Sequence, residues 1–149
     1  MDAIELREPL ADPLLDHAAV ENALLVRRVR ADLLARAGAV TVDMLADGRG
    51  GSEGATRQWL RRHRERGRLI TVEHAGRTLV PSFQLDEAFD LDPVVADTIE
   101  RLFQFGLDAW AGWRWFYAEN GWIGRRPVDA AKAGDAAALT RAAAGLLEA

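Results

Sequence analysis

His17, His63 and His74 are the three histidines of this sequence, and histidine is the side chain that most often carries acid–base or metal chemistry near neutral pH. None of them stands at a metal-ligand spacing from another histidine or an aspartate. The chain has no cysteine, which removes thiolate nucleophiles, disulfides and cysteine-ligated zinc. We therefore expect no metal site, no catalytic residue and no cofactor.

The serines, glycines and paired acids do not complete a catalytic motif either. Ser52 and Ser82 have no evident histidine and carboxylate partners in the sequence. The glycine-rich run 48–51 lacks the Gly-Lys-Ser/Thr ending of a phosphate-binding loop. Asp86 and Glu87 stand in a polar link, where a solvated role is the common one. These patterns predict a protein that is not an enzyme.

The charges of the chain are segregated along the sequence, although the net charge is only −4. Residues 86–97 are acidic and hold no basic residue. Residues 56–68 hold a single acid, Glu65, among six arginines: Arg57, Arg61, Arg62, Arg64, Arg66 and Arg68. Such segregation favours one face that binds a polyanion. The alternative for the arginines is a solvated helix face with no ligand.

The elements that would position these arginines can be read from caps and periodicity. We expect a long helix over residues 16–37 with a broad apolar stripe, then a short helix capped by Thr41. A turn over 48–51 follows, and Ser52 caps a third helix that runs to about residue 66. In that helix Ala55, Trp59 and Leu60 should face inward, and the arginines with Gln58 should face outward.

The rest of the chain reads as one hairpin and three more helices. Strands are expected over 69–72 and 78–80, joined around Ala75-Gly76 and closed by Pro81. Helices should then begin at Asp92-Pro93, at Asp108 and at Asp135, ending near Gly106, residues 120–121 and residue 147. The fold class is thus mainly α, in three segments. These are an extension with a long helix (1–37), a helix-turn-helix with a β-hairpin wing (38–85) and a helical C-terminal lobe (86–149).

The third helix and the hairpin together predict DNA binding. A recognition helix fits the major groove, where arginine and glutamine make paired hydrogen bonds to base edges. The residues expected to read the groove are Arg57, Gln58, Arg61 and Arg62, and those expected to touch the backbone are Arg64, Arg66, Arg68 and Arg77. The glycine turn is longer than the three or four residues usual in this motif, which would weaken DNA binding.

The segment 110–134 predicts a protein–protein interface. It holds four of the five tryptophans together with Arg125 and Arg126, and aromatic and arginine side chains are the usual hot spots of interfaces. We expect Trp110 and Phe116 to pack in the core. The other residues can anchor or pair with a partner, namely Trp113, Trp115, Trp122, Arg125 and Arg126. The C-terminal helix, with Arg141 and residues 146–149, could plug a cleft; fraying of this tail is the alternative.

From Gly38 onward the sequence resembles the Xre/MbcA/ParS-type antitoxins of RES-domain toxin–antitoxin systems. Three blocks carry the resemblance: RQWLRRHRERGRLITVEHAGRTLVP, then Pro81-Ser82-Phe83-Gln84, then Trp115-Phe116 with Asn120, Ile123-Gly124, Arg126-Pro127-Val128 and Gly134. The sequence departs from the pattern at Arg125, where a second glycine is common, and at Ala130-Ala131, which replace leucines. The first 37 residues match no family pattern.

The resemblance implies an antitoxin that binds a cognate RES toxin, an NAD-degrading enzyme whose fold resembles ADP-ribosyltransferases, and blocks its active-site cleft. The NAD chemistry belongs to the toxin, so the chain itself should need no cofactor. Many relatives also repress their own operon and form homo-oligomers or complexes with toxin. The toxin-binding residues would be Trp113, Trp115, Asn120, Trp122, Arg125, Arg126, Arg141 and Glu148.

A stand-alone helix-turn-helix regulator with a C-terminal dimerisation lobe is the alternative function. For either function we expect a cytoplasmic protein with operator DNA as a partner. The absence of cysteine suits a reducing compartment, and no apolar run in the sequence approaches the length that a bilayer crossing needs.

Overall fold

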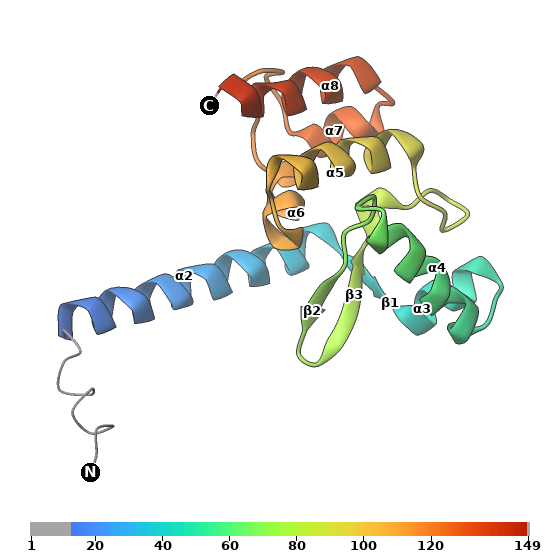
Figure 1. Cartoon of the computed structure of the whole chain (residues 1–149), viewed down its shortest axis with the longest axis horizontal. Helices are drawn as coiled ribbons and strands as arrows, with labels where there is room; N and C mark the ends of the chain where they lie inside the picture. The colour runs from blue at the N-terminus through green and yellow to red at the C-terminus, as the bar shows by residue number, and fades with distance from the viewer. Residues whose placement is uncertain (1–12, 149) are drawn as a thin grey trace, which may run out of the picture. The chain divides into compact units, whose positions relative to one another are not determined.

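The computed structural model describes residues 13–148 of the 149-residue chain (Figure 1). The fold is mainly helical and contains a small three-stranded antiparallel sheet. The chain divides into two compact units, one up to residue 35 and one from residue 36 onward. Each unit is described below by itself.

The first unit consists of helix α2 (Pro13–Ala37), whose last two residues belong to the second unit. The predicted helix over 16–37 is confirmed and begins slightly earlier. Taken by itself, this helix exposes its described side chains from residue 17 to residue 28.

The second unit opens with strand β1 (Ala39–Thr41) and helices α3 (Val42–Arg49) and α4 (Glu53–Glu65). The two predicted caps are confirmed. The Thr41 side chain accepts a hydrogen bond from the Met44 amide at 3.4 Å, and that of Ser52 accepts one from the Ala55 amide at 3.1 Å.

The turn between α3 and α4 is shorter than the sequence predicts. Gly50, with φ of 71°, takes the left-handed conformation that ends α3, so Gly48 and Arg49 are still helical. Only residues 50–52 separate the two helices. The expectation of a long turn is therefore wrong, and the observed three-residue turn has the length usual in helix-turn-helix motifs.

The sheet has the strand order β1-β3-β2 and is antiparallel throughout. Strands β2 (Val72–His74) and β3 (Arg77–Pro81) form the predicted hairpin around Ala75-Gly76, both of which have positive φ angles. Strand β1, which the sequence analysis missed, pairs Ala39 with Pro81.

Residues 69–71 do not join the sheet, contrary to prediction, and a side chain satisfies the backbone of the central residue, Ile70. The buried Gln84 amide accepts a hydrogen bond from the Ile70 amide at 2.9 Å and donates one to the Ile70 carbonyl at 2.7 Å. It also donates to the Pro81 carbonyl at 3.1 Å. Gln84 thus takes the place of a neighbouring strand for Ile70.

A helical layer follows the sheet. After a 3-10 turn, η2 (Ser82–Gln84), the helices are α5 (Pro93–Phe105), α6 (Ala109–Tyr117), α7 (Pro127–Lys132) and α8 (Ala136–Ala144), and η3 (Gly145–Glu148) ends the described chain. Asp92, Asp108 and Asp135 cap α5, α6 and α8 as predicted. Helix α5 packs on α6 and α8, and α7 packs on both of these as well (Figure 1).

Two groups of buried side chains hold the second unit together. One lies under α3, α4 and the sheet and comprises Val42, Leu45, Trp59, Leu60, Leu69 and Val80. The other lies among the C-terminal helices and includes Ile99, Leu102, Trp113, Phe116 and Leu139. Phe89 and Leu91, from the acidic stretch expected to separate two lobes, pack on the first group. That stretch therefore lies against helices α3 and α4.

Candidate nucleic-acid interface

Helix α4 exposes an arginine-rich face opposite its buried face. Thr56, Trp59 and Leu60 are almost fully buried and recur at helical spacing, which fixes the orientation of the helix. The expectation that Ala55 faces inward is wrong, since it is exposed and Thr56 occupies the inner position. The predicted groove-reading residues are all exposed: Arg57, Gln58, Arg61 and Arg62.

Two of these arginines are held by glutamates one turn away on the same helix. Arg57 lies 3.4 Å from Glu53, and Arg61 lies 3.2 Å from Glu65. All four side chains are more than half exposed, and exposed pairs of this kind contribute little free energy. Both guanidinium groups can therefore exchange their carboxylate for a stronger acceptor such as phosphate.

The tip of the hairpin borders the first turn of α4. Arg57 of α4 and Arg77 of β3 line the same polar hollow of about 240 Å³, together with Thr41, Val42, Asp43, Glu53, Gly76 and Thr78. A hydrogen bond from the Thr41 hydroxyl holds the pKa of Asp43 below its usual value. The hollow therefore contains carboxylates as well as arginines, and its basic side chains project from two elements.

The end of α4 adds further positive charge. Arg64 and Arg66 are exposed, as predicted for residues that contact a nucleic-acid backbone. His63, by contrast, turns inward and packs its ring against Trp59, with 4.9 Å between the ring centroids. Burial, and then the charges of nearby arginines, lower its pKa.

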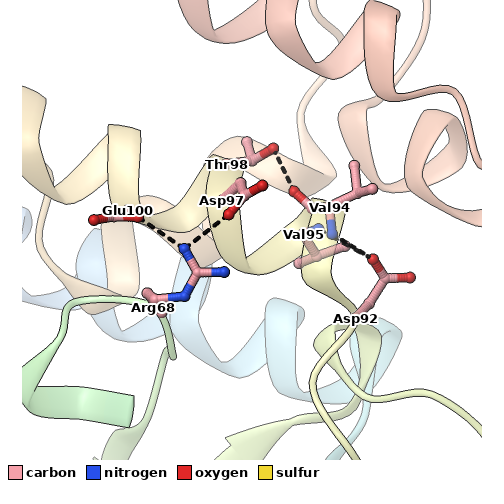
Figure 2. A network of polar contacts seen from close by, with 7 residues as sticks. All are labelled: Arg68, Asp92, Val94, Val95, Asp97, Thr98 and Glu100. Atoms are coloured by element: carbon pink, nitrogen blue, oxygen red, sulfur yellow. Dashed lines mark hydrogen bonds and ion pairs between the residues drawn. The ribbon is translucent and has the colours of Figure 1, made fainter.

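Arg68 has a different environment from the other arginines (Figure 2). Its guanidinium lies 2.7 Å from the Asp97 carboxylate and 2.8 Å from that of Glu100, and these contacts raise its pKa. Only 26% of the side chain is exposed. The predicted contact of Arg68 with a nucleic-acid backbone is therefore replaced by a tether between the end of α4 and helix α5.

Arg49 forms a second tether that the sequence analysis missed. Its guanidinium carbon lies 3.9 Å from the centre of the Trp59 ring, and its Nη1 donates to the Phe89 carbonyl at 2.9 Å. The same nitrogen lies 3.1 Å from Asp90. Neighbouring glycines made Arg49 look like part of a solvated turn, so no sequence signal indicated this contact.

More of the aromatic side chains in the segment 110–134 lie in the core than the sequence predicts. Phe116 is fully buried, as expected, but so is Trp113, which the sequence analysis placed at an interface. Trp110 stacks on Trp113 with 5.5 Å between ring centroids, and Trp115 contacts Phe116 edge to face. Helix α6 packs on α5 and α7, and Trp113 is fully buried there, so its side chain cannot contact a partner.

Arg125 and Arg126 brace the turn that follows α6. Arg125 lies 2.5 Å from Asp135, and Arg126 pairs with Asp129 through two hydrogen bonds of 2.9 and 3.1 Å. The Arg126 contact lowers the pKa of Asp129. Asn120 accepts a hydrogen bond from the Trp122 amide at 3.0 Å. These three predicted toxin-binding residues therefore have contacts within the chain that account for their positions.

Trp122, Arg141 and Glu148 are the predicted interface residues that remain well exposed. Trp122 is 58% exposed, and one edge of its ring lies against Gly145, the residue that follows α8. A separate apolar groove of about 360 Å³ lies between α5 and the α8–η3 segment. The groove is lined by Arg101, Gln104, Phe105, Thr140, Ala143, Ala144, Leu146 and Leu147.

Residues 13–148 contain neither a cluster of metal-ligating side chains nor a helix that could cross a membrane. Histidine, aspartate and glutamate side chains do not gather there in groups of three that could hold a metal ion. In that same range, each helix is too short or too polar to cross a bilayer.

Comparison with known proteins places this chain by its fold alone. No protein-family model matches the sequence, and no curated protein is significantly similar to it. The NMR structure of Rv2175c superposes with a TM-score of 0.59 at 20% sequence identity, covering 73% of this chain and 81% of that one. At this identity the chain is similar to Rv2175c in fold.

Proposed function

We propose that this protein binds double-stranded DNA, with α4 as the recognition helix of a winged helix-turn-helix. One observation carries the proposal. Arg57, Gln58, Arg61 and Arg62 are exposed together on the outer face of a helix that begins three residues after α3. Arg77 of the hairpin lines the same hollow as Arg57.

The chemistry of this surface suits a duplex. A helix of 13 residues can enter the major groove, where Gln58 can pair with adenine and the arginines with guanine. Arg64, Arg66 and Arg77 lie at the ends of the surface, where phosphates flank the groove. Arg68 is not part of this surface, because Asp97 and Glu100 hold it.

A net charge of −4 does not oppose this function, because phosphates respond to the local charge of the surface that meets them. Within the acidic stretch 86–92, Phe89 lies against Gly48 of α3 and Asp90 pairs with Arg49. The three arginines proposed to meet phosphates, Arg64, Arg66 and Arg77, would release about three counterions on a B-form duplex, so binding should be salt-dependent.

Fluorescence anisotropy with a labelled duplex tests the proposal directly. We expect salt-sensitive binding that the double reversal Arg61→Glu, Arg62→Glu abolishes. The matched control is Arg114→Glu on α6, an exposed arginine away from α4, which should bind like the wild type. The proposal fails if the wild-type protein does not bind duplexes at low salt, or if the control variant loses binding equally.

Neutralisation of a RES-type toxin is the second candidate function. It is favoured by one observation, the apolar groove that holds the exposed side chains of Phe105 and Leu147. Exposed aromatic and aliphatic side chains around a hollow are typical of protein interfaces. With Trp113 in the core, a toxin would meet Trp122, the groove and the tail that carries Arg141 and Glu148.

Co-expression with the neighbouring open reading frame tests this second function. We expect that product alone to arrest growth and deplete intracellular NAD, and the wild-type chain to restore both. The double change Trp122→Ala, Phe105→Glu should not restore them, while Arg61→Glu, Arg62→Glu should. A harmless neighbour, or full protection by the groove variant, would leave a stand-alone DNA-binding regulator as the function.

A further inference from the structure

Helices α5 and α8 leave an apolar groove between them near their C-terminal ends. The two helices pack side by side and run in the same direction (Figure 1). The groove, of about 360 Å³, lies between the end of α5 and the segment from α8 to η3. All of its lining residues belong to the second unit, so its shape is set within that unit.

Two large apolar side chains border this groove and remain open to solvent. Phe105 is 45% exposed and Leu147 is 75% exposed. In the described part of the second unit, the other exposed large apolar side chains are Met44 and Trp122, and neither lines the groove. Exposed apolar side chains gathered around a hollow mark a surface that binds another molecule.

The two ends of the groove differ in charge. Arg101 lies one helical turn before Phe105 on α5 and lines one end. Glu148 is exposed and follows Leu147, so it lies toward the other end. Within residues 13–148, no ion pair joins Arg101 or Glu148 to another residue. A partner with an acid at the Arg101 end and a base at the Glu148 end would complement both charges.

The shape of the groove favours a helix as its occupant. Two helices that pack side by side leave a furrow along their axes, which receives the side chains of a third helix. Arg101 and Phe105 lie about 6 Å apart along α5. Side chains three or four positions apart on a helix have a similar separation. One face of a helix can therefore meet the arginine and the apolar part of the groove together.

We propose that the groove between α5 and α8 binds an amphipathic helix of a partner protein, in which an acidic residue stands three or four positions from a large apolar one. The apolar side chain lies between Phe105 and Leu147, the carboxylate pairs with Arg101, and a basic residue on the far side faces Glu148. This specificity rests on the second candidate function, in which a partner protein meets the groove.

Selection from a displayed library of helices tests the chemistry of the occupant. Each member carries one fixed leucine and all residue types at the positions four residues before and after it. Immobilised wild-type protein should enrich acids at one varied position, and Arg101→Glu should enrich lysine or arginine there instead. Arg114→Glu, an exposed change on α6, is the matched control and should enrich acids as wild type does. No enrichment on wild type, or the same residue type on all three proteins, overturns the proposal.

The affinity of one selected helix tests the position of the site. Phe105→Glu and, separately, Leu147→Glu should raise the Kd of the labelled peptide by at least about thirtyfold in fluorescence anisotropy, a loss typical of an interface hot spot. Met44→Glu is the matched control, because Met44 is 51% exposed but lies on α3, and it should bind the peptide like wild type. Equal weakening by all three changes, or no weakening by the groove changes, contradicts the proposal.

Co-expression with the neighbouring open reading frame separates the helix site from the toxin function. If the selected helix binds at Phe105 but the neighbouring product is harmless, the helix site stands and the toxin function fails. If the chain neutralises that product and neither Phe105→Glu nor Leu147→Glu reduces protection, the toxin function stands and the helix site is overturned. A wild-type dimer that Phe105→Glu converts to monomers in sedimentation equilibrium would assign the groove to a second copy of the chain, which also overturns the proposal.

Discussion

The ring of Phe89 lies against the backbone of Gly48, so closely that a Cβ atom at position 48 would come within 2.6 Å of it. Gly48→Ala must therefore displace the ring and the loop around it. We expect a loss of about 1–3 kcal/mol in the free energy of unfolding, typical of overpacking, measured by urea denaturation.

Gly54→Ala is the matched control for this prediction. Both glycines are helical, but a Cβ atom at position 54 meets nothing within 4 Å. Alanine is the better helix former by about 0.5–1 kcal/mol, so Gly54→Ala should be neutral or stabilising. Equal destabilisation by the two changes would show that Phe89 does not pack on Gly48.

The tether from Arg68 to Asp97 and Glu100 predicts an energetic coupling between α4 and α5. A double-mutant cycle with Arg68→Ala and Glu100→Ala should give a coupling free energy of about 0.5–1 kcal/mol, because the carboxylates remain partly solvated. Arg66→Ala, an exposed change two residues earlier, should show no coupling to Glu100→Ala. Coupling of the same size for Arg66 would refute the tether.

The Gln84 amide predicts an unusual pH response for Gln84→Glu. A carboxylate at this buried position would face the carbonyl oxygens of Ile70 and Pro81, so its pKa in the folded protein must rise. A raised folded pKa means that stability is present below the unfolded value of about 4.3 and is lost as pH rises. We expect the variant to be at least about 2 kcal/mol less stable than wild type at neutral pH.

Thermal melts across pH check this response. The difference between Gln84→Glu and wild type should shrink as the solution becomes more acidic. Gln104→Glu, an exposed change on α5, should follow the wild type at every pH. A Gln84→Glu variant as stable as wild type at neutral pH would mean that the two carbonyls are not held against the side chain.

The lowered pKa of His63 predicts a second pH dependence, with the opposite sign. Its neutral form is favoured in the folded state by burial and by the nearby arginines. That contribution is complete above the usual histidine pKa of about 6.5 and is lost as pH falls through the lower folded value. The melting temperature of wild type should therefore drop below pH 6.5 more steeply than that of His63→Gln, whereas the exposed His74→Gln should behave like wild type.

The proposed DNA surface predicts two distinguishable defects. Arg64→Ala should weaken binding to all duplexes and reduce the salt slope by about one, because Arg64 is proposed to meet a phosphate. Gln58→Ala should instead flatten the preference for the base pair it contacts, at a cost of about 1–3 kcal/mol. Binding of selected and mixed-sequence duplexes at several salt concentrations separates the two. Identical effects of both changes would show that Gln58 does not contact a base.

Local signals in the sequence predicted most of the helix starts. Thr41, Ser52, Asp92, Asp108 and Asp135 cap the helices expected of them, because a cap depends on a few adjacent residues. Positions decided by distant contacts were missed. Gly48 looks like a turn residue by itself and is helical because Gly50 ends α3, and Ile70 looks like a strand residue but pairs with Gln84.

In the candidate site, too, features set by local sequence were predicted and features set by distant contacts were not. The outward face of α4 could be predicted because helical periodicity alone sets it. The partners of Arg68 and Arg125 could not be predicted, since Asp97 and Glu100 lie about thirty positions from Arg68 and Asp135 lies ten positions from Arg125, so packing decides both contacts. Trp113 was assigned to an interface because residue type does not distinguish a core aromatic from a contact aromatic.

The tether of Arg68 connects the two surfaces that are proposed to bind DNA and a protein partner. It joins the end of α4 to α5, and α5 also forms one wall of the apolar groove that contains Phe105. A groove ligand that shifts α5 would also shift the end of α4, because this ion pair joins the two helices. Linkage then requires that such a ligand and DNA change each other's affinity by the same factor, in the same direction.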